Sequence, residues 1–265
     1  MKAVIRRGIY HGLRHSGAVS FRRAQRVSAG NGWATILAFH TLSKTYPHDG
    51  ITMSPDLFRD IARMLRAQYF VISLTELLTR LRHRRPFTGR EVVITFDDGY
   101  HDNYEFAVPT LLELELPACF YLTAGFIGTR RQFPWDAVKG RTTMMMRWDD
   151  AREMHGLGFE IGCHTWSHPD LGTEPITSVR RELHDARKRI EDELGARVAH
   201  FAYPFGGLRN IRPEWVEAVR DAGFESNVRC HGGQVVAGDD PFWIAREGCH
   251  QRSATDVRIV VDDPW

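Results

Sequence analysis

Two pairs of polar residues in this sequence have the types and spacing for hydrolytic chemistry. Asp97 and Asp98 are adjacent, follow the apolar run 91–96, and precede Gly99. Two neighbouring carboxylates at a strand end are costly unless a cation holds them. Successive side chains of an extended segment point in different directions, so one carboxylate could bind a metal while the other stays free as a base. Taken alone, the pair is better explained as an ordinary Asp-Asp-Gly surface turn after a strand.

The second pair is His164 and His168, four residues apart after the apolar run 159–163. Two histidines at this spacing can meet one metal if the segment makes a helical turn, although alone they could be unrelated. With Asp98 they give two imidazoles and one carboxylate, a pattern of catalytic zinc sites that leaves positions open for water and substrate. We predict these three as metal ligands and Asp97 as a general base beside the activated water. Zinc is the default metal, and cobalt, nickel or manganese would fit similar ligands.

The elements that must position these residues alternate along the chain. We expect strands over 34–39, 69–72, 91–96, 118–123, 159–163, 198–203, 224–228 and 242–246. We expect helices from Pro55 and after Ser73, and over 103–115 (kinked at Pro109), 148–157, 176–194 and 213–222, with a long loop over 124–147. This alternation predicts an α/β fold with a parallel sheet built of βα units. Polar residues recur at the strand ends, where barrels of βα units hold their active sites.

The composition excludes several classes of protein. The 265 residues carry 26% charged and 43% hydrophobic residues, which excludes a disordered chain, a collagen and a coiled coil. No apolar run approaches the length of a membrane span. Residues 1–32 contain seven Lys and Arg and no acid, so the remaining residues, with 28 basic and 33 acidic, are mildly acidic. Basic residues confined to a tail argue against a nucleic-acid-binding domain.

We therefore divide the chain into a basic N-terminal tail, 1–32, and a catalytic domain, 33–265. The tail lacks the uninterrupted apolar core of a signal peptide. Its apolar residues alternate with cationic ones, which is typical of an amphipathic segment lying on an anionic membrane, although a solvated arm fits as well. We expect a cytoplasmic protein with reduced cysteines, in peripheral contact with the inner face of the membrane, and leave its oligomeric state open.

Three motifs, taken in order, resemble those of the NodB-type polysaccharide deacetylases, carbohydrate esterase family 4. They are Thr95-Phe96-Asp97-Asp98-Gly99, His164-Thr-x-x-His168 and Phe201-Ala202-Tyr203-Pro204-Phe205-Gly206. The resemblance extends over about 34–248. It implies a distorted, incomplete (β/α) barrel and metal-dependent removal of N-acetyl, or sometimes O-acetyl, groups from a sugar.

The same resemblance assigns roles to individual residues. Asp97 matches the general base, and Asp98, His164 and His168 match the metal ligands. Tyr203, Pro204 and Phe205 match a wall of the substrate groove, where a backbone N–H contributes to the oxyanion hole. From the residues themselves, Trp166 and Trp135 could stack on a sugar ring, and the loop cations Arg130, Arg131, Lys139 and Arg141 could meet an anionic substrate or remain solvated.

The sequence departs from the family pattern at three points. The family has an arginine after the first Phe of the third motif, which orients the catalytic aspartate, and here Ala202 takes its place. The fourth-motif Asp–Trp pair and the fifth-motif Leu-x-His, which supplies the catalytic acid, are absent. These departures resemble a subgroup that deacetylates exopolysaccharides such as poly-N-acetylglucosamine. Its early strand ending in His and late strand with Arg match His40 and Arg246.

We infer that His40 is the missing acid or a substrate-facing group, and that Arg246 replaces the absent arginine by pairing with Asp97. His231 and His250 are weaker candidates for the acid. The preferred function is removal of N-acetyl groups from an amino-sugar polysaccharide or a lipid-linked glycan. The alternatives are hydrolysis of a small non-sugar amide, or a catalytically dead glycan-binding module. Retention of Asp97 favours an enzyme, because binding a metal requires only the other three residues.

Overall fold

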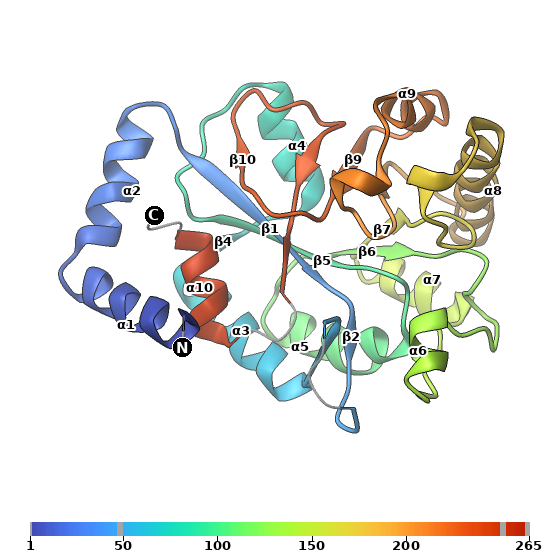
Figure 1. Ribbon diagram of the computed structural model, residues 1–265, viewed down its shortest axis with the longest axis horizontal. Helices are drawn as coiled ribbons and strands as arrows, with labels where there is room; N and C mark the ends of the chain where they lie inside the picture. The colour runs from blue at the N-terminus through green and yellow to red at the C-terminus, as the bar shows by residue number, and fades with distance from the viewer. Residues whose placement is uncertain (1, 47–49, 250–252, 263–265) are drawn as a thin grey trace.

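The computed structural model describes residues 2–46, 50–249 and 253–262, with the side chains of 2–7 left aside. Its centre is a sheet that curls into a nearly closed barrel (Figure 1). The neighbouring strands are β1 (Trp33–Phe39), β5 (Glu91–Phe96), β6 (Cys119–Leu122), β7 (Glu160–Cys163), β8 (His200–Ala202), β9 (Ser226–Arg229) and β11 (Ile244–Ala245), all parallel. The predicted parallel α/β barrel is confirmed.

One short segment closes this barrel. β11 pairs with β9, and β12 (Glu247–Gly248) pairs with β1 at the opposite edge of the sheet. Arg246 alone separates the two strands. The chain thus crosses from the last strand of the barrel to the first within five residues, and Arg246 sits at the seam.

Smaller strands extend the sheet at its margins. β4 (Phe70–Val71) pairs with the first residues of β5, and β10 (Val235–Val236) runs antiparallel to β1. β2 (Thr41–Leu42) and β3 (Thr52–Met53) form a separate two-stranded sheet after β1. β2, β3 and β10 were not expected from the sequence, because two-residue strands carry no detectable alternation of apolar and polar residues.

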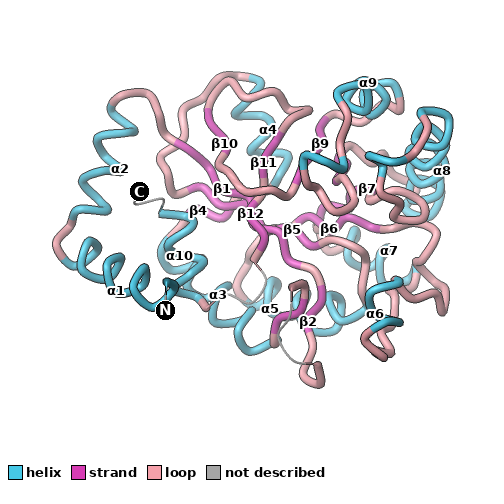
Figure 2. Tube along the Cα trace, in the orientation of Figure 1, coloured by secondary structure: helices cyan, strands magenta, loops and turns pink. Residues whose placement is uncertain are grey.

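Helices surround the barrel, as the cyan segments around the magenta strands in Figure 2 show. They are α3 (Pro55–Gln68), α4 (Leu74–Arg82), α5 (Val108–Glu113), α6 (Pro134–Val138), α7 (Trp148–Gly156), α8 (Ile176–Leu194), α9 (Pro213–Asp221) and α10 (Ala254–Asp262), with 3₁₀ turns at Leu171–Thr173 and Leu208–Asn210. The hydroxyls of Ser54 and Ser73 accept hydrogen bonds from the first turns of α3 and α4, as expected of N-caps. α8 ends at Gly195, whose φ of +63° suits a residue without a Cβ.

The expected kinked helix over 103–115 takes a different form. A π-helical turn, Asn103–Ala107, precedes α5, and Pro109 falls in the first turn of α5. The backbone is helical throughout 101–113, so Pro109 lies inside one helical segment, just after its hydrogen-bond pattern changes from π to α. The expected loop over 124–147 likewise contains α6.

The N-terminal residues form two helices, α1 (Lys2–His15) and α2 (Ala18–Ser28), that lie beside α10 (Figure 1). The side chain of Tyr10 is fully buried, and its hydroxyl donates a 2.5 Å hydrogen bond to the carboxylate of Asp262 in α10. Val19 and Ile259 are buried in the same contact. Among the described residues, no helix combines the length and the apolar character of a membrane span.

Aromatic packing supports the strand ends that carry the polar residues. Phe96, at the end of β5, stacks on Phe120 of β6 with ring centroids 4.9 Å apart, and on Phe39 of β1 at 5.4 Å. Residues 97 and 98 follow Phe96 directly, so this stack fixes the point at which the chain leaves the sheet. All four cysteines are in the thiol form.

Candidate active site

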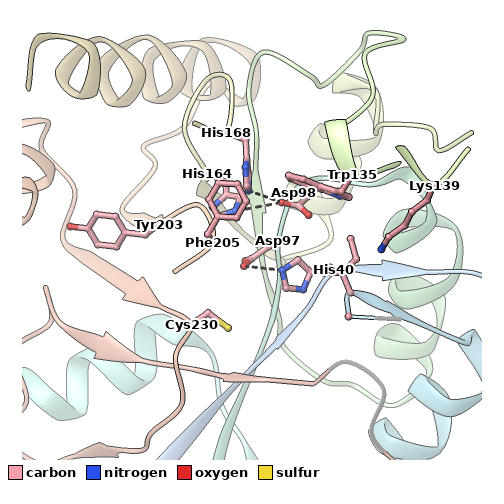
Figure 3. A pocket seen from close by; sticks show the side chains of 12 residues that line it. His40, Asp97, Asp98, Trp135, Lys139, His164, His168, Tyr203, Phe205 and Cys230 are labelled. Carbon is pink, nitrogen blue, oxygen red and sulfur yellow. Dashed lines mark ion pairs between the residues drawn. The ribbon is translucent and has the colours of Figure 1, made fainter. Parts of the chain in front are cut away.

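A cavity of about 290 Å³ lies at the carboxyl ends of the barrel strands (Figure 3). Its lining residues are His40, Gly50, Ile51, Asp97, Asp98, Trp135, Lys139, His164, His168, Tyr203, Phe205 and Cys230. His40 follows β1, the two aspartates follow β5, and His164 follows β7. The parallel barrel therefore gathers residues from distant parts of the chain at one edge, as the strand pattern predicted.

Asp98, His164 and His168 form one cluster in this cavity. The Nε2 atoms of His164 and His168 lie 3.5 and 3.4 Å from the same Oδ1 of Asp98. One ligand atom from each residue lies within 4.8 Å of the others, an arrangement that could hold a metal ion. The Oδ1 atom of Asp98 is buried and has no hydrogen-bond partner among the described residues. A buried, unpartnered carboxylate oxygen facing two imidazole nitrogens fits a divalent cation.

The charge state of the cluster also suits a cation. Nδ1 of His164 lies 2.8 Å from the carbonyl oxygen of Ala202, which can only accept, so this nitrogen carries a hydrogen and Nε2 is the atom left to bind a cation. Burial lowers the pKa of His164, but the neighbouring Asp97 and Asp98 outweigh it and the net shift is upward. Burial raises the pKa of Asp98, but the two imidazoles outweigh it and hold that pKa well below its usual range. Burial lowers the pKa of His168, which favours the neutral ligand form.

The loop that carries the histidines is not the helical turn that the spacing suggested. Thr165 and His168 have φ of +67° and +59°, and Asp98 has +77°. Left-handed backbone is uncommon for residues other than glycine and gathers at functional sites. The Thr165 hydroxyl accepts the His168 N–H at 3.0 Å. Glu182 of α8 accepts the N–H groups of Trp166 and Ser167, each at 2.8 Å, and so fixes the loop from outside.

Asp97 is bound by Arg246 in a two-pronged ion pair. Nη1 and Nη2 of the arginine each lie 2.7 Å from one carboxylate oxygen, and Nη1 also donates to the hydroxyl of Thr95 at 2.9 Å. Arg246 is fully buried, and its guanidinium lies 5.2 Å from the ring centroid of Tyr121. Burial raises the pKa of Asp97, but Arg246 outweighs it and the net shift is downward. Asp97 is therefore an ionised carboxylate able to accept a proton, and the predicted pairing is observed.

His40 faces Asp97 within the cavity (Figure 3). Its Nε2 lies 3.9 Å from Oδ2 of Asp97, and its buried Nδ1 has no hydrogen-bond partner among the described residues. The carbonyl of His40 accepts a 2.6 Å hydrogen bond from the amide of Asn103, which fixes the backbone. Of the weaker acid candidates, His231 is exposed and outside the cavity lining, and His250 lies outside the described residues.

Aromatic residues form one wall of the cavity. Phe205 is 52% exposed, and its ring centroid lies 4.8 Å from that of His168. Trp135 lies 5.0 Å from His168, and its indole N–H donates to the hydroxyl of Tyr100 at 2.9 Å, which holds the ring in place. Both rings can present a face or an edge to a sugar.

Of the residues expected to bind the substrate, Tyr203 and Phe205 line the cavity and two others do not. Tyr203 is buried, its ring points away from Asp97 (Figure 3), and its backbone N–H donates to the Val228 carbonyl at 3.1 Å, so that donor is engaged within the sheet. Pro204 and the partly exposed Trp166 are not among the cavity-lining residues.

Sequence reasoning gave no role to Cys230 or Glu182, and it left Lys139 open between contact with an anionic substrate and solvent. Lys139, left open as a solvated loop cation, lines the cavity, as does Cys230. Glu182 holds the histidine loop. Lys139 directly follows α6 and Glu182 lies within α8, and no local motif marks either residue.

Comparisons with known proteins agree with this architecture. Residues 84–226 match the family model described as polysaccharide deacetylase. A putative polysaccharide deacetylase of Bacillus subtilis is 26% identical over 142 residues, 54% of this chain and 45% of that protein. A chitin deacetylase of Amylomyces rouxii is 25% identical over 124 residues, 46% of this chain and 25% of that protein. The chain thus spans less than half the length of these curated relatives.

Solved structures share the fold. IcaB from Ammonifex degensii has a TM-score of 0.73 at 23% identity, with 87% of this chain and 97% of that chain covered. The Streptococcus pyogenes deacetylase PplD, solved in complex with acetate, has a TM-score of 0.72 at 20% identity, with 86% and 98% covered.

Proposed function

Since the chain belongs to the polysaccharide deacetylase family, we propose that it is a metal-dependent hydrolase that removes N-acetyl groups from an amino-sugar glycan. The observation that carries this proposal is the buried Arg246–Asp97 pair next to the Asp98, His164 and His168 cluster. A glycan-binding module that only held a metal would need the cluster alone. A carboxylate kept ionised beside it is what a hydrolase requires of a general base.

Each group in the cavity has a part in this reaction. A divalent metal held by Asp98, His164 and His168, with zinc the default, would polarise the acetyl carbonyl and make water more acidic. Asp97 accepts the proton of the attacking water, and Arg246 keeps its two oxygens oriented for that transfer. His40, whose Nε2 faces Asp97, donates a proton to the departing sugar amine. Phe205 and Trp135 hold the sugar ring.

For the substrate, we favour an amino-sugar exopolysaccharide or its lipid-linked precursor. The support is the early strand ending in His40 and the late strand with Arg246, the pattern that resembles the exopolysaccharide deacetylases. Both residues stand in the cavity wall or against Asp97, in positions that let them replace the family's missing acid and arginine.

We further propose that the N-terminal helices rest on an anionic membrane surface. Residues 1–32 contain no acidic residue. Ile9 of α1 and Phe21 of α2 are 49% and 69% exposed, so the two helices offer apolar side chains among cationic ones. That combination is typical of helices that lie at a lipid interface. A membrane-bound glycan precursor would then be close to the enzyme.

The decisive experiment measures acetate released from N-acetylglucosamine oligomers by the purified protein. We expect release by the zinc-loaded protein, its loss with a chelator, and its return when zinc, cobalt, nickel or manganese is added back. An N-acetylated amine that is not a sugar serves as the control substrate. Release from that amine alone would favour the small-amide hydrolase, and no release with any metal would favour a binding module.

A further inference from the structure

A second cavity, of about 380 Å³, lies between the N-terminal helices and the barrel. Its walls include Arg14 of α1, Arg23 of α2, Gln68 at the end of α3, Arg90 before β5, and Asp262 of α10. Three arginines against one carboxylate give this small space an excess of two positive charges. Arginine stays protonated at any physiological pH, so the excess is permanent.

Asp262 has no capacity left to neutralise that excess. One oxygen accepts from the hydroxyl of Tyr10 at 2.5 Å and from Nη1 of Arg14 at 2.9 Å. The other accepts from the hydroxyl of Tyr69 at 2.8 Å and from Nη2 of Arg23. Four donors, two of them cationic, saturate this carboxylate, which ties α1, α2 and α10 together.

Of the three arginines in the cavity wall, Arg90 is the one that does not contact Asp262. Its Nε and Nη2 donate to the neutral carbonyl of Gln68 at 3.2 and 2.6 Å, its guanidinium lies 4.9 Å from the ring centroid of Phe70, and among the described residues it has no ion pair. Arg23 lies close by, because a Cβ on Gly89 would come within 3.1 Å of its Cγ. The Nε of Arg23 is buried and has no hydrogen-bond partner within the described residues. Two guanidinium groups in one cavity therefore keep donors available.

We propose that this cavity binds a phosphate group. Two excess positive charges match a phosphate monoester dianion, and the planar forks of Arg23 and Arg90 suit its tetrahedral oxygens. The hydroxyl of Ser20, also in the wall, offers a further donor. The cavity volume is in the range of small-molecule sites, roughly 300–1,000 Å³, so the phosphate can belong to a larger molecule, either a lipid headgroup or a soluble phosphate compound.

This site is separate from the catalytic cavity. Arg90 directly precedes β5 and Asp97 directly follows it. At roughly 3.3 Å per residue the two residues are about 20 Å apart. A test of the phosphate site is therefore independent of a test of the deacetylase activity.

Calorimetry with inorganic phosphate tests the proposal on the full chain. We expect saturable binding that weakens at least about tenfold in Arg90→Gln, a variant that leaves the Asp262 contacts intact. Ser20→Asp should weaken binding by repulsion without removing an arginine. Arg22→Gln, which removes a cation of α2 outside the cavity wall, should bind as the wild type does. Thermal unfolding of each variant verifies its fold.

Vesicles distinguish the two sources of phosphate. Phosphatidylcholine vesicles with phosphatidic acid present a phosphomonoester headgroup. If Arg90→Gln binds these vesicles more weakly than Arg22→Gln does, the ligand is a lipid headgroup. If Arg90→Gln weakens the binding of free phosphate but not of vesicles, the ligand is a soluble phosphate compound. The proposal is overturned if the wild type binds neither probe, or if Arg90→Gln and Ser20→Asp bind both as the wild type does.

Discussion

Arg246 contacts both carboxylate oxygens of Asp97 at 2.7 Å while the fully buried arginine stands at the junction of β11 and β12. The ion pair thus joins the segment that closes the barrel to the residue that we propose as the base. We propose that this arginine, more than 140 residues downstream of Asp97 in sequence, replaces the arginine of the family's usual motif, where Ala202 stands here.

Arg246→Lys should reduce kcat about 100-fold and leave the metal content unchanged. Lysine keeps the charge but presents a single ammonium, so it cannot hold both oxygens of Asp97, and small misplacements of catalytic groups carry costs of this size. Steady-state kinetics with metal analysis checks this. Arg229→Lys, at the end of β9, is the matched control. Full activity in Arg246→Lys would show that the two-pronged geometry does not position the base.

Asp97→Asn and Asp98→Asn should separate turnover from metal binding. In Asp97→Asn the amide could not accept a proton, so kcat should fall by roughly 10²- to 10⁴-fold while the metal stays bound. Asp98→Asn would remove the anionic ligand, and the protein should lose its metal on dialysis. Metal analysis of both variants decides between the roles. If Asp97→Asn loses the metal and Asp98→Asn retains it, the assignments are reversed.

His40→Gln should slow amide hydrolysis by roughly 10²- to 10⁴-fold without loss of metal. The variant lacks the proposed proton donor, so the damage should depend on the leaving group. An aryl acetate ester, whose phenolate leaves without protonation, should be hydrolysed at nearly the wild-type rate. Equal loss on amide and ester would indicate that His40 positions the site, and no loss on the amide would remove it as the acid.

The free energy of unfolding should decrease as the pH rises, because of the buried carboxyl group of Asp102. Burial raises its pKa to about 7, against opposing hydrogen bonds from the Leu42 N–H and the Thr41 hydroxyl. Because the folded state holds this proton more tightly than the unfolded state, the contribution is fully present below about pH 4 and is lost as the pH passes 7. Urea unfolding should show a loss of about 2 kcal/mol between pH 5 and pH 8 that is smaller in Asp102→Asn. An identical pH dependence in the variant would contradict this.

Phe21→Ser should weaken binding to anionic vesicles about tenfold, because it removes an apolar side chain that is 69% exposed on α2. Vesicle sedimentation measures the partitioning. A point variant is preferable to deleting residues 1–32, since deletion would also remove Tyr10 from its contact with Asp262. Leu112→Ser, at a 44% exposed position of α5, serves as the control. Equal binding by both variants and the wild type would remove this role from the N-terminal helices.

Local sequence signals were sufficient for much of the fold. The apolar runs marked β1 and β5, and Gly195 marked the end of α8. The aspartates and histidines could be grouped because each pair follows a strand, and parallel strands end at one edge. Their roles remain predictions. The strand-end argument also applies to His40, which follows the apolar run 34–39. Its role, and the pairing of Arg246 with Asp97, could be inferred only through the family resemblance, because neither residue lies near Asp97 in sequence.

The remainder depends on contacts that no local pattern encodes. Trp135, in the short helix α6, and Lys139, directly after it, reach the cavity from a region expected to be a loop. Trp166 lies outside the cavity lining, on a segment that contains left-handed residues and is not a helical turn. The packing of α1 depends on Tyr10 meeting Asp262, 252 residues away. Amphipathic spacing predicts that such a segment can form a helix, but it does not predict which buried carboxylate the helix contacts.

The short strands on either side of Arg246 also predict which part of the barrel unfolds first. Only two residue pairs join β11 to β9, and two join β12 to β1, so this is a weak point from which the barrel can fray while its long strands remain paired. Each opening there would withdraw the guanidinium from Asp97 and leave the carboxylate without its counter-charge. On warming, catalytic activity should therefore be lost at a lower temperature than the helical circular dichroism signal. The difference between the two temperatures reflects how much less stable the β11–β12 closure is than the rest of the barrel.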